Sequence, residues 1–193
     1  MTAALGSRLT PPVEAYVSRV AEAIAGLRAL YLLGSAATGG FNPETSDLDV
    51  VAVVGRPLSE HDKRAIVHAV AELDVPVRRL ELVVYAAGSQ PPEFDLNLNA
   101  DERGARELQD EPRHWFVIDA ALAQEHAVAL SGPPWAAFFA PLEPERVRQA
   151  LEQSLAWSAD RPGDEFARLN AIRARHYLDH GEWIGKREAE EAG

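Results

Sequence analysis

Two aspartates separated by a single leucine stand at the start of an apolar run, "SDLDVVAVV", residues 46–54. The run predicts a buried strand, and side chains two positions apart on a strand point to the same face. Asp47 and Asp49 are therefore expected side by side, about 6–7 Å apart along a strand that rises 3.3 Å per residue. Mg²⁺ resolves the repulsion between them, because it prefers oxygen ligands and commonly uses one or two carboxylates together with substrate phosphates.

A third carboxylate, Glu81, stands in the middle of another apolar run, "RLELVVY". Leu80 and Leu82 flank it, and an acid in such a setting indicates a chemical role. If the two strands are neighbours, Glu81 joins Asp47 and Asp49 in a cluster of three carboxylates. Such a cluster can bind one or two metal ions and take a proton from an attacking hydroxyl.

A Gly-Ser pair, Gly34 and Ser35, closes the apolar run that precedes the two aspartates. Glycine at a strand end followed by serine at a helix start presents backbone N–H groups and a hydroxyl to phosphate oxygens. Together with metal-binding carboxylates, the pair favours a nucleoside triphosphate held for in-line attack. Each feature alone also fits a structural role, since Asp-x-Asp is common in turns and caps and a mid-strand glutamate can face water. Their occurrence together, in this order, favours catalysis.

Hydrophobic spacing predicts the elements that position these residues. Residues 10–27 predict a helix with Thr10 as N-cap, and residues 59–73 predict a helix that Ser59 opens. Apolar runs at 27–34, 48–54 and 77–86 predict buried strands. The order helix, strand, turn, strand, helix, strand predicts an α/β core.

Beyond residue 86 the pattern changes. A loop leads into one alternating segment at Phe94, Leu96 and Leu98, and residues 114–127, 143–157 and 164–180 predict helices. Residues 131–144, rich in proline and aromatic side chains, predict a packed connector. We place a boundary near residue 112, which predicts a domain carrying the acids at 1–112 and a helical C-terminal domain at 113–193.

Composition limits the partners of this chain of 193 residues. Its formal net charge is −11, its sequence pI is near 5.0 and it has no cysteine. An acidic chain repels phosphate backbones, which disfavours nucleic acid and anionic membranes and favours cationic ligands or anions escorted by a metal. The absence of cysteine removes thiolate chemistry and is compatible with a reducing cytoplasm. With no signal sequence at its start and no run of ~20 apolar residues, the chain is expected to be cytoplasmic.

The motif "GS", eleven residues and "DLD", followed by a strand glutamate, resembles the nucleotidyltransferase superfamily of DNA polymerase beta, and especially its bacterial aminoglycoside nucleotidyltransferases. The resemblance implies a polymerase-beta-like α/β (α+β) core, with a short mixed sheet flanked by helices, and a small α-helical domain after it. It also implies that Asp47, Asp49 and Glu81 bind Mg²⁺ and that Glu81 is the general base. Gly34 and Ser35 fall at the triphosphate. AMP then passes from ATP to an acceptor hydroxyl, with release of pyrophosphate.

Two later segments narrow the resemblance to the streptomycin/spectinomycin adenylyltransferases. "HWFVIDAALAQEHAVALSGP", residues 114–133, is similar to the helix and Gly-Pro turn after their catalytic domain. "ARLNAIRARHYLDHGEWIGKREAEEA", residues 167–192, is similar to the helical segment with their nucleotide-contacting arginine and lysine, which correspond to Arg173 and Lys186. Asp164 and Glu165 stand near the place of the family's substrate-facing acids and are candidates for contact with the acceptor.

The chain departs from this family in two respects. No tryptophan lies between Glu81 and Trp115, where the family has one that contacts the drug. The helical part is also shorter than the family's. This leaves open a smaller acceptor pocket, an oligomer or partner chain that completes the site, or a shortened chain.

Two functions are consistent with these features. The first is a nucleotidyltransferase that moves AMP from Mg-ATP to a hydroxyl of a small cationic acceptor such as an aminoglycoside, which implies antibiotic resistance. The alternative is a non-catalytic or regulatory nucleotide-binding protein, or a partner-dependent nucleotidyltransferase, of the same fold. Three mutually repelling acids favour the enzyme, because a degenerate site has no reason to keep them.

Overall fold

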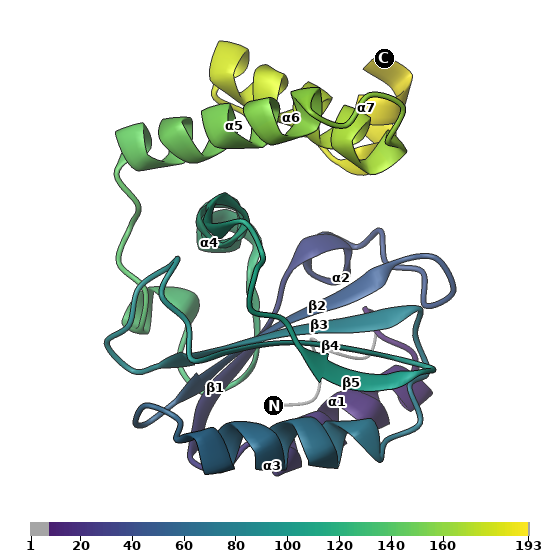
Figure 1. The fold of residues 1–193 in the computed structure, drawn as a ribbon, viewed down its shortest axis with the longest axis vertical. Helices are drawn as coiled ribbons and strands as arrows, with labels where there is room; N and C mark the ends of the chain where they lie inside the picture. Colours follow the sequence, from purple (N-terminus) through teal and green to yellow (C-terminus); the bar gives the residue numbers. More distant parts are fainter. Residues whose placement is uncertain (1–7, 193) are drawn as a thin grey trace. The chain divides into compact units, whose positions relative to one another are not determined.

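The computed structural model describes residues 8–192, in which helices and strands are mixed first and helices follow (Figure 1). The start of the chain, for which the sequence predicts no signal, and Gly193 lie outside the described residues. The described helices are α1 (Pro11–Ala23), α2 (Gly34–Thr38), α3 (Glu60–Ala71), α4 (Arg113–His126), the 3-10 turn η1 (Trp135–Ala137), α5 (Pro144–Ala159), α6 (Glu165–His180) and α7 (Lys186–Ala192). The described strands are β1 (Leu27–Leu32), β2 (Asp47–Val54), β3 (Arg79–Ala86), β4 (Leu96–Asp101), β5 (Gly104–Glu107) and β6 (Val128–Ser131).

The chain divides into two compact units. The first contains the residues up to Glu111 and the segment Ala123–Ala140, and the second contains Pro112–Leu122 and the residues from Pro141 onward. The segment that returns to the first unit carries β6 and η1. The domain limits expected from the sequence, 1–112 and 113–193, stay a prediction, because compactness alone does not show that a unit folds by itself.

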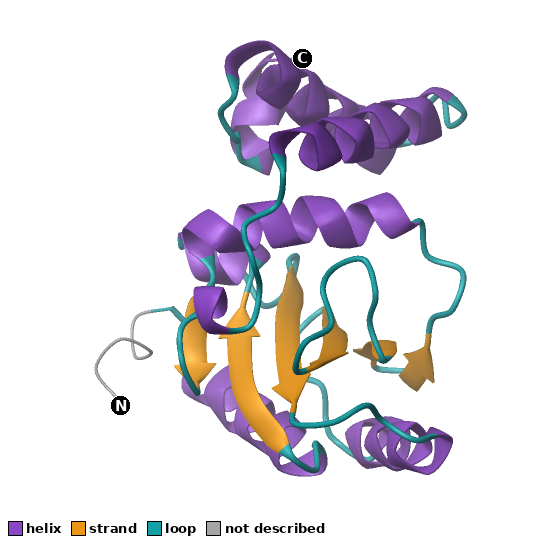
Figure 2. Cartoon of the chain, turned by 90° about the vertical axis from the view of Figure 1, so that its left-hand side faces the viewer, coloured by secondary structure: helices purple, strands orange, loops and turns teal. Residues whose placement is uncertain are grey.

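A mixed sheet with strand order β5-β4-β3-β2-β1-β6 organises the first unit. Strands β2 and β3 are parallel, and each other neighbouring pair is antiparallel. Helix α3 lies between β2 and β3 in the chain, as a parallel pair requires a crossover connection. Figure 2 shows the curved sheet with helices below it. This parallel pair positions the candidate site, since it brings β2, which carries Asp47 and Asp49, next to β3, which carries Glu81.

Helices α1 and α3 cover one face of the sheet and form the main core with it (Figure 1). From α1, Val13, Val17 and Val20 are buried, and from α3, Ile66 and Val70. These positions follow the helical spacing seen in the sequence. The strands contribute alternating side chains to the same core: Leu30, Leu32, Leu48, Val50, Ala52, Leu80, Leu82, Val84, Leu96 and Leu98.

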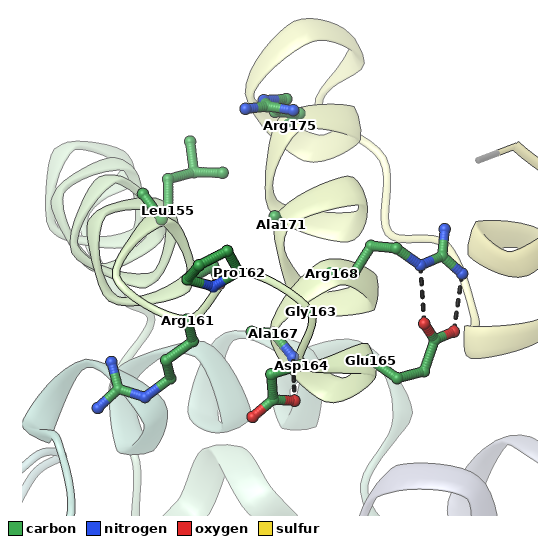
Figure 3. Close-up of a pocket in the computed structure, with 12 residues that line it drawn as sticks. Leu155, Arg161, Pro162, Gly163, Asp164, Glu165, Ala167, Arg168, Ala171 and Arg175 are labelled. Carbon is green, nitrogen blue, oxygen red and sulfur yellow. Dashed lines mark hydrogen bonds and ion pairs between the residues drawn. The ribbon is translucent and has the colours of Figure 1, made fainter.

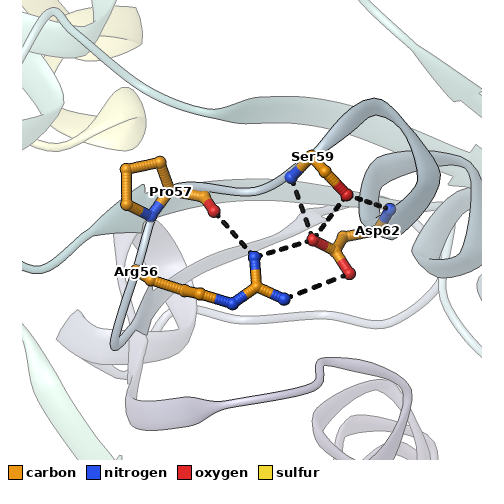
Figure 4. Close-up of polar contacts among 4 residues, drawn as sticks. All are labelled: Arg56, Pro57, Ser59 and Asp62. Carbon is orange, nitrogen blue, oxygen red and sulfur yellow. Dashed lines mark hydrogen bonds and ion pairs between the residues drawn. The ribbon is translucent and has the colours of Figure 1, made fainter.

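The start of α3 shows how local sequence fixes an element. Ser59 is its N-cap, as predicted, and forms a capping box with Asp62, in which the Asp62 N–H donates to Ser59 Oγ at 3.2 Å. Arg56 donates to the carboxylate of Asp62 at 2.9 Å (Figure 4). The Arg56 guanidinium and the hydrogen bonds from Ser59 hold the pKa of Asp62 below its ordinary value. The helix therefore begins at a position that its own side chains define.

Three strands of the sheet, β4, β5 and β6, go beyond those predicted. Strand β4 alternates leucine with asparagine, so only part of it reads as apolar. Strands β5 and β6 have four residues each, too few for a periodic signal to emerge. Strand β5 forms a hairpin with β4, in which Asp101 pairs with Gly104, whereas β6 pairs with β1, which lies far away in the sequence.

The second unit consists of helices that match the predicted helical stretches. A cluster of buried apolar side chains joins α4, α5 and α6: Val117, Ile118, Ala121, Val147, Ala150, Leu151 and Ala174. The ring of Trp115 lies edge-on to that of Trp157, with centroids 5.4 Å apart. No helix between residues 8 and 192 is both long enough and apolar enough to cross a lipid bilayer.

Candidate active site

The acids of β2 and β3 lie together on the sheet face that is opposite the α1 and α3 core. In the parallel register Asp49 pairs with Glu81, and Asp47 pairs with Arg79. Leu48, between the two aspartates, is fully buried on the core side. The arrangement expected from the sequence, in which acids of two neighbouring strands share one face, is therefore present.

An arginine lies between two of these acids. Nη2 of Arg79 donates to Oδ2 of Asp47 at 2.7 Å and to Oε1 of Glu81 at 2.5 Å. Arg78 contacts the other oxygen of Asp47, with Nε donating to Oδ1 at 3.0 Å. Neither contact is expected from the sequence. The repulsion between the acids is thus compensated inside the chain by two guanidinium groups.

Glu81 has the electrostatic setting of a proton acceptor. Burial raises its pKa above the ordinary value of a glutamate, and although Arg79 opposes this shift, Asp47 and Glu111 add to it. A raised pKa makes the carboxylate a stronger base once it is ionised. The side chain is 37% exposed, so a reacting hydroxyl can reach it.

Gly34 is required by the close approach of the chain to Asp49. Its φ of +54° favours glycine, and a Cβ at this position would lie 1.9 Å from Oδ2 of Asp49. The N–H of Leu33 donates to the backbone oxygen of Asp49 at 2.9 Å, which ties the start of α2 to β2. Gly34 and the second aspartate of the motif therefore meet, and Ser35 follows in the first turn of α2.

Two asparagines of β4 share this face of the sheet and are absent from the sequence-based candidates. Asn99 stands opposite Glu81 across the β3–β4 pair, and Asn97 stands opposite Val83. Both are more than nine-tenths buried. They bring carboxamide donors and acceptors next to the candidate base. The alternation "LNLN", residues 96–99, is the signal that could have identified them.

The donor chemistry of this face fits magnesium, although the side chains are arranged around a guanidinium. In the described part of the chain, no group of three or more Asp, Glu, His or Cys side chains has a metal-binding arrangement. Arg79 holds Asp47 and Glu81 instead. Carboxylate oxygens of adjacent strands are nevertheless the ligand type that Mg²⁺ takes when phosphates complete its coordination. Asp47, Asp49 and Glu81 are therefore the residues that could hold it.

The predicted nucleotide contacts Arg173 and Lys186 belong to the second unit, whereas the acids belong to the first. Nε of Arg173 donates to the backbone oxygen of Ile184 at 3.0 Å, which ties α6 to the segment before α7. Lys186 is exposed at the first turn of α7. Their contact with a nucleotide stays a prediction.

The acids Asp164 and Glu165 line a pocket of about 280 Å³ at the α5–α6 connection (Figure 3). Asp164 is the N-cap of α6 and accepts from the N–H of Ala167 at 3.1 Å. Glu165 pairs with Arg168 at 2.8 Å, and this hydrogen bond lowers the pKa of Glu165. Both acids thus have structural roles within the second unit, and their contact with an acceptor stays a prediction.

Comparisons with known proteins agree with the geometry of the first unit. Residues 17–102 match the family model described as a nucleotidyltransferase domain. No curated protein sequence matches the chain.

Among solved structures, the chain is similar to the spectinomycin adenyltransferase AAD(9) from Enterococcus faecialis, crystallised with ATP and spectinomycin. The two share 19% identity over 93% of this chain and 81% of the other, with a TM-score of 0.73. A toxin–antitoxin structure with AMP-PNP shares 13% identity over 77% of this chain and 91% of the other, with a TM-score of 0.36. The expected fold, a mixed sheet flanked by helices and followed by helices, is confirmed. Residues 17–102 therefore match a nucleotidyltransferase domain, and the chain has the polymerase-beta-like nucleotidyltransferase fold.

Proposed function

We propose that this protein transfers AMP from Mg-ATP to a hydroxyl group of a small acceptor and releases pyrophosphate. The observation that carries the proposal is the register of β2 and β3, which pairs Asp49 with Glu81 on a face that also holds Asp47. The nucleotidyltransferase domain at residues 17–102 supports the same reaction class.

Glu81 takes the proton in the proposed reaction. The acceptor oxygen attacks the α-phosphorus of ATP, a P–O bond forms to that oxygen, and the bond to the bridging oxygen of pyrophosphate breaks. The hydroxyl proton passes to the Glu81 carboxylate, whose raised pKa suits this task. Asp47, Asp49 and Glu81 would hold Mg²⁺, which would supply charge stabilisation for the phosphates. Asn99, which is opposite Glu81 across the β3–β4 pair, and Asn97 are proposed to orient the acceptor.

The proposed nucleotide contacts are Gly34, Ser35, Arg173 and Lys186. Gly34 and Ser35 bind the triphosphate beside Asp49, which the close approach of Gly34 to that carboxylate supports. Arg173 and Lys186, the contacts that the family resemblance implies, are proposed to contribute positive charge to the phosphates. ATP as co-substrate is supported by the adenyltransferase of the same fold, which was crystallised with it.

The acceptor in this proposal is a small cationic molecule with a hydroxyl group, such as an aminoglycoside, which would make the protein an antibiotic-resistance enzyme of the cytoplasm. The net charge of −11 supports a cation, since an acidic protein attracts it over long range. The structural relative was crystallised with spectinomycin, which supports a drug-like acceptor. Asp164 and Glu165 are the proposed contacts of the acceptor in the second unit, and a partner chain that completes the acceptor site belongs to the same proposal.

The test is one incubation with labelled ATP, Mg²⁺ and a library of hydroxyl acceptors that includes spectinomycin. We expect a mass increase of one adenylyl group on an acceptor and the release of pyrophosphate. Asp47→Asn should abolish both, because it keeps the shape and removes the charge. Asp74→Asn removes the same charge from an exposed position of the first unit and should leave transfer unchanged.

Two outcomes would contradict this proposal. Near wild-type turnover in Asp47→Asn would show that Asp47 is not a required ligand of Mg²⁺. Tight ATP binding without pyrophosphate release for any acceptor would favour the alternative, a regulatory nucleotide-binding protein or a partner-dependent enzyme of the same fold.

A further inference from the structure

We propose that Arg79 is a built-in competitor of the divalent cation, because its guanidinium occupies the cation position between Asp47 and Glu81. A metal ion can bind both carboxylates only after Arg79 has left them. This inference rests on the magnesium assignment of the proposed function and adds a positioning residue to it.

The contacts of a single nitrogen carry the argument. Nη2 of Arg79 lies 2.7 Å from Oδ2 of Asp47 and 2.5 Å from Oε1 of Glu81. Magnesium binds carboxylate oxygens at about 2.0–2.1 Å. An ion bridging these two oxygens would therefore need the space that Nη2 holds. Two positive charges cannot share that space, so the arginine and the metal compete.

The position of Arg79 follows from the sheet rather than from a flexible surface contact. Arg79 pairs with Asp47 in the parallel register and precedes Glu81 by two residues, so all three side chains project from one face. Its side chain is 30% exposed, against 52% for Arg78, which contacts Asp47 alone. Arg79 therefore bridges the two acids, and Arg78 does not.

Only part of the Arg79 guanidinium has hydrogen-bond partners: Nη2 contacts the two carboxylates, but Nε does not. Its Nε is buried and has no hydrogen-bond partner within the described residues. A buried donor without a partner raises the free energy of this arrangement, so less is lost when the side chain moves away. Arg79 can thus neutralise the acids in the absence of metal and still release them.

A consequence is that metal binding depends on the nucleotide. Without ATP, a metal ion that binds the carboxylates of Asp47 and Glu81 must break their contacts with Arg79, and nothing compensates for that loss. With ATP, phosphate oxygens complete the coordination of the ion and offer the displaced guanidinium a new anionic partner. The metal should therefore bind weakly alone and much more tightly together with ATP.

The experiment measures Mn²⁺ binding by electron paramagnetic resonance, in nucleotide-free protein and with a non-hydrolysable ATP analogue. Without nucleotide, Arg79→Gln should bind Mn²⁺ about three- to tenfold more tightly than the wild type, because a partly exposed charge contact no longer has to be broken. Arg78→Gln is the matched control and should change affinity by at most about twofold. A purely structural role of Arg79 predicts the opposite, a loss of Mn²⁺ affinity in Arg79→Gln.

Thermal unfolding gives a second measurement on the same proteins. In EDTA, Arg79→Gln should melt below the wild type, and the rise in Tm on adding Mg²⁺ should be larger in the variant. If circular dichroism shows that Arg79→Gln does not fold, Arg79→Lys replaces it. A lysine keeps the charge but lacks the planar guanidinium, so its Mn²⁺ affinity should lie above that of the wild type.

Equal or weaker Mn²⁺ binding by the folded Arg79 variant would overturn this inference alone. Equal gains in Arg78→Gln and Arg79→Gln would overturn it as well, since bridging would then be irrelevant. Absence of Mn²⁺ binding from wild type and variants even with the ATP analogue would overturn the magnesium assignment of the proposed function.

Discussion

The two faces of the central sheet are built from the same strands but differ in role: one packs in the core, and the other carries the candidate site. On β3, Leu80, Leu82 and Val84 are fully buried against the helices, whereas Arg79 and Glu81 face the other way and stay partly exposed. A shift of the chain by one residue would exchange the two sets. Burial of the apolar side chains therefore fixes the strand register, and this register places Arg79 and Glu81 on the polar face.

The same offset applies to β2 and β4. Leu48 separates Asp47 from Asp49, and Leu98 separates Asn97 from Asn99, with both leucines fully buried. Burial of such a side chain contributes about 1.5–3 kcal/mol, more than an exposed ion pair of about 0–1 kcal/mol. The positions of the site residues are thus decided mainly by their apolar neighbours.

The largest expected effect is the loss of catalysis when Glu81, on the polar face of β3, is replaced. Glu81→Gln should lower the rate of nucleotidyl transfer about 10²–10⁴-fold, because it removes the proton acceptor. ATP binding should persist, as measured by calorimetry, and circular dichroism should show an unchanged fold. A variant with at least a tenth of the wild-type rate would contradict the role of Glu81 as base.

Replacement of the neighbouring residue, Leu82, should instead lower the stability of the fold. Leu82→Ala creates a cavity on the core face and should lower the free energy of unfolding by about 2–5 kcal/mol in urea denaturation. Val83→Ala, a truncation on the site face of the same strand, should cost less, since Val83 is only partly buried. Equal losses for the two variants would remove the distinction between the faces.

A third change tests the contact between the Gly-Ser turn and β2. Gly34→Ala should lower the free energy of unfolding by about 1–3 kcal/mol, because φ is positive and the new Cβ would meet Asp49. Gly40→Ala has open space around its Cβ and should stay within about 0.5 kcal/mol of the wild type. A neutral Gly34→Ala in thermal and urea unfolding would mean that α2 and β2 are further apart.

The smallest expected effect concerns pH. Because burial raises the pKa of Glu81, the folded state holds this proton more strongly than the unfolded state. Its contribution to stability therefore falls as pH rises from the unfolded pKa to the raised folded pKa. In Glu81→Gln this fall should disappear from the free energy of unfolding measured across acidic pH. If the variant keeps the wild-type pH dependence, the setting of Glu81 is not as described.

Much of this site could be predicted from the sequence because its signals are local. The apolar runs around Asp49 and Glu81 indicate strands, and the alternation within each run indicates which side chains share a face. Ser59 and Asp62 mark the start of α3 in the same way. These inferences hold because each depends on neighbours a few positions away.

Other features depend on partners that are distant in the chain. The asparagines of β4 gain meaning only from pairing with β3, which places Asn99 opposite Glu81. The segment with β6 reads as part of a helical region, yet β6 pairs with β1, about a hundred residues earlier. Spacing within a segment can indicate a strand, but it does not show which other strand that segment pairs with.

The sequence by itself determined which acids belong to the candidate site, which strands carry them and which face of each strand they occupy, because the two-residue repeat of a strand is a local property. Only the tertiary structure decided that β2 and β3 pair in parallel register, that Gly34 touches Asp49, and that Arg79 lies between Asp47 and Glu81. The physical reason is that strand pairing and charge contacts depend on distances in space, and those distances exist only once the core has packed.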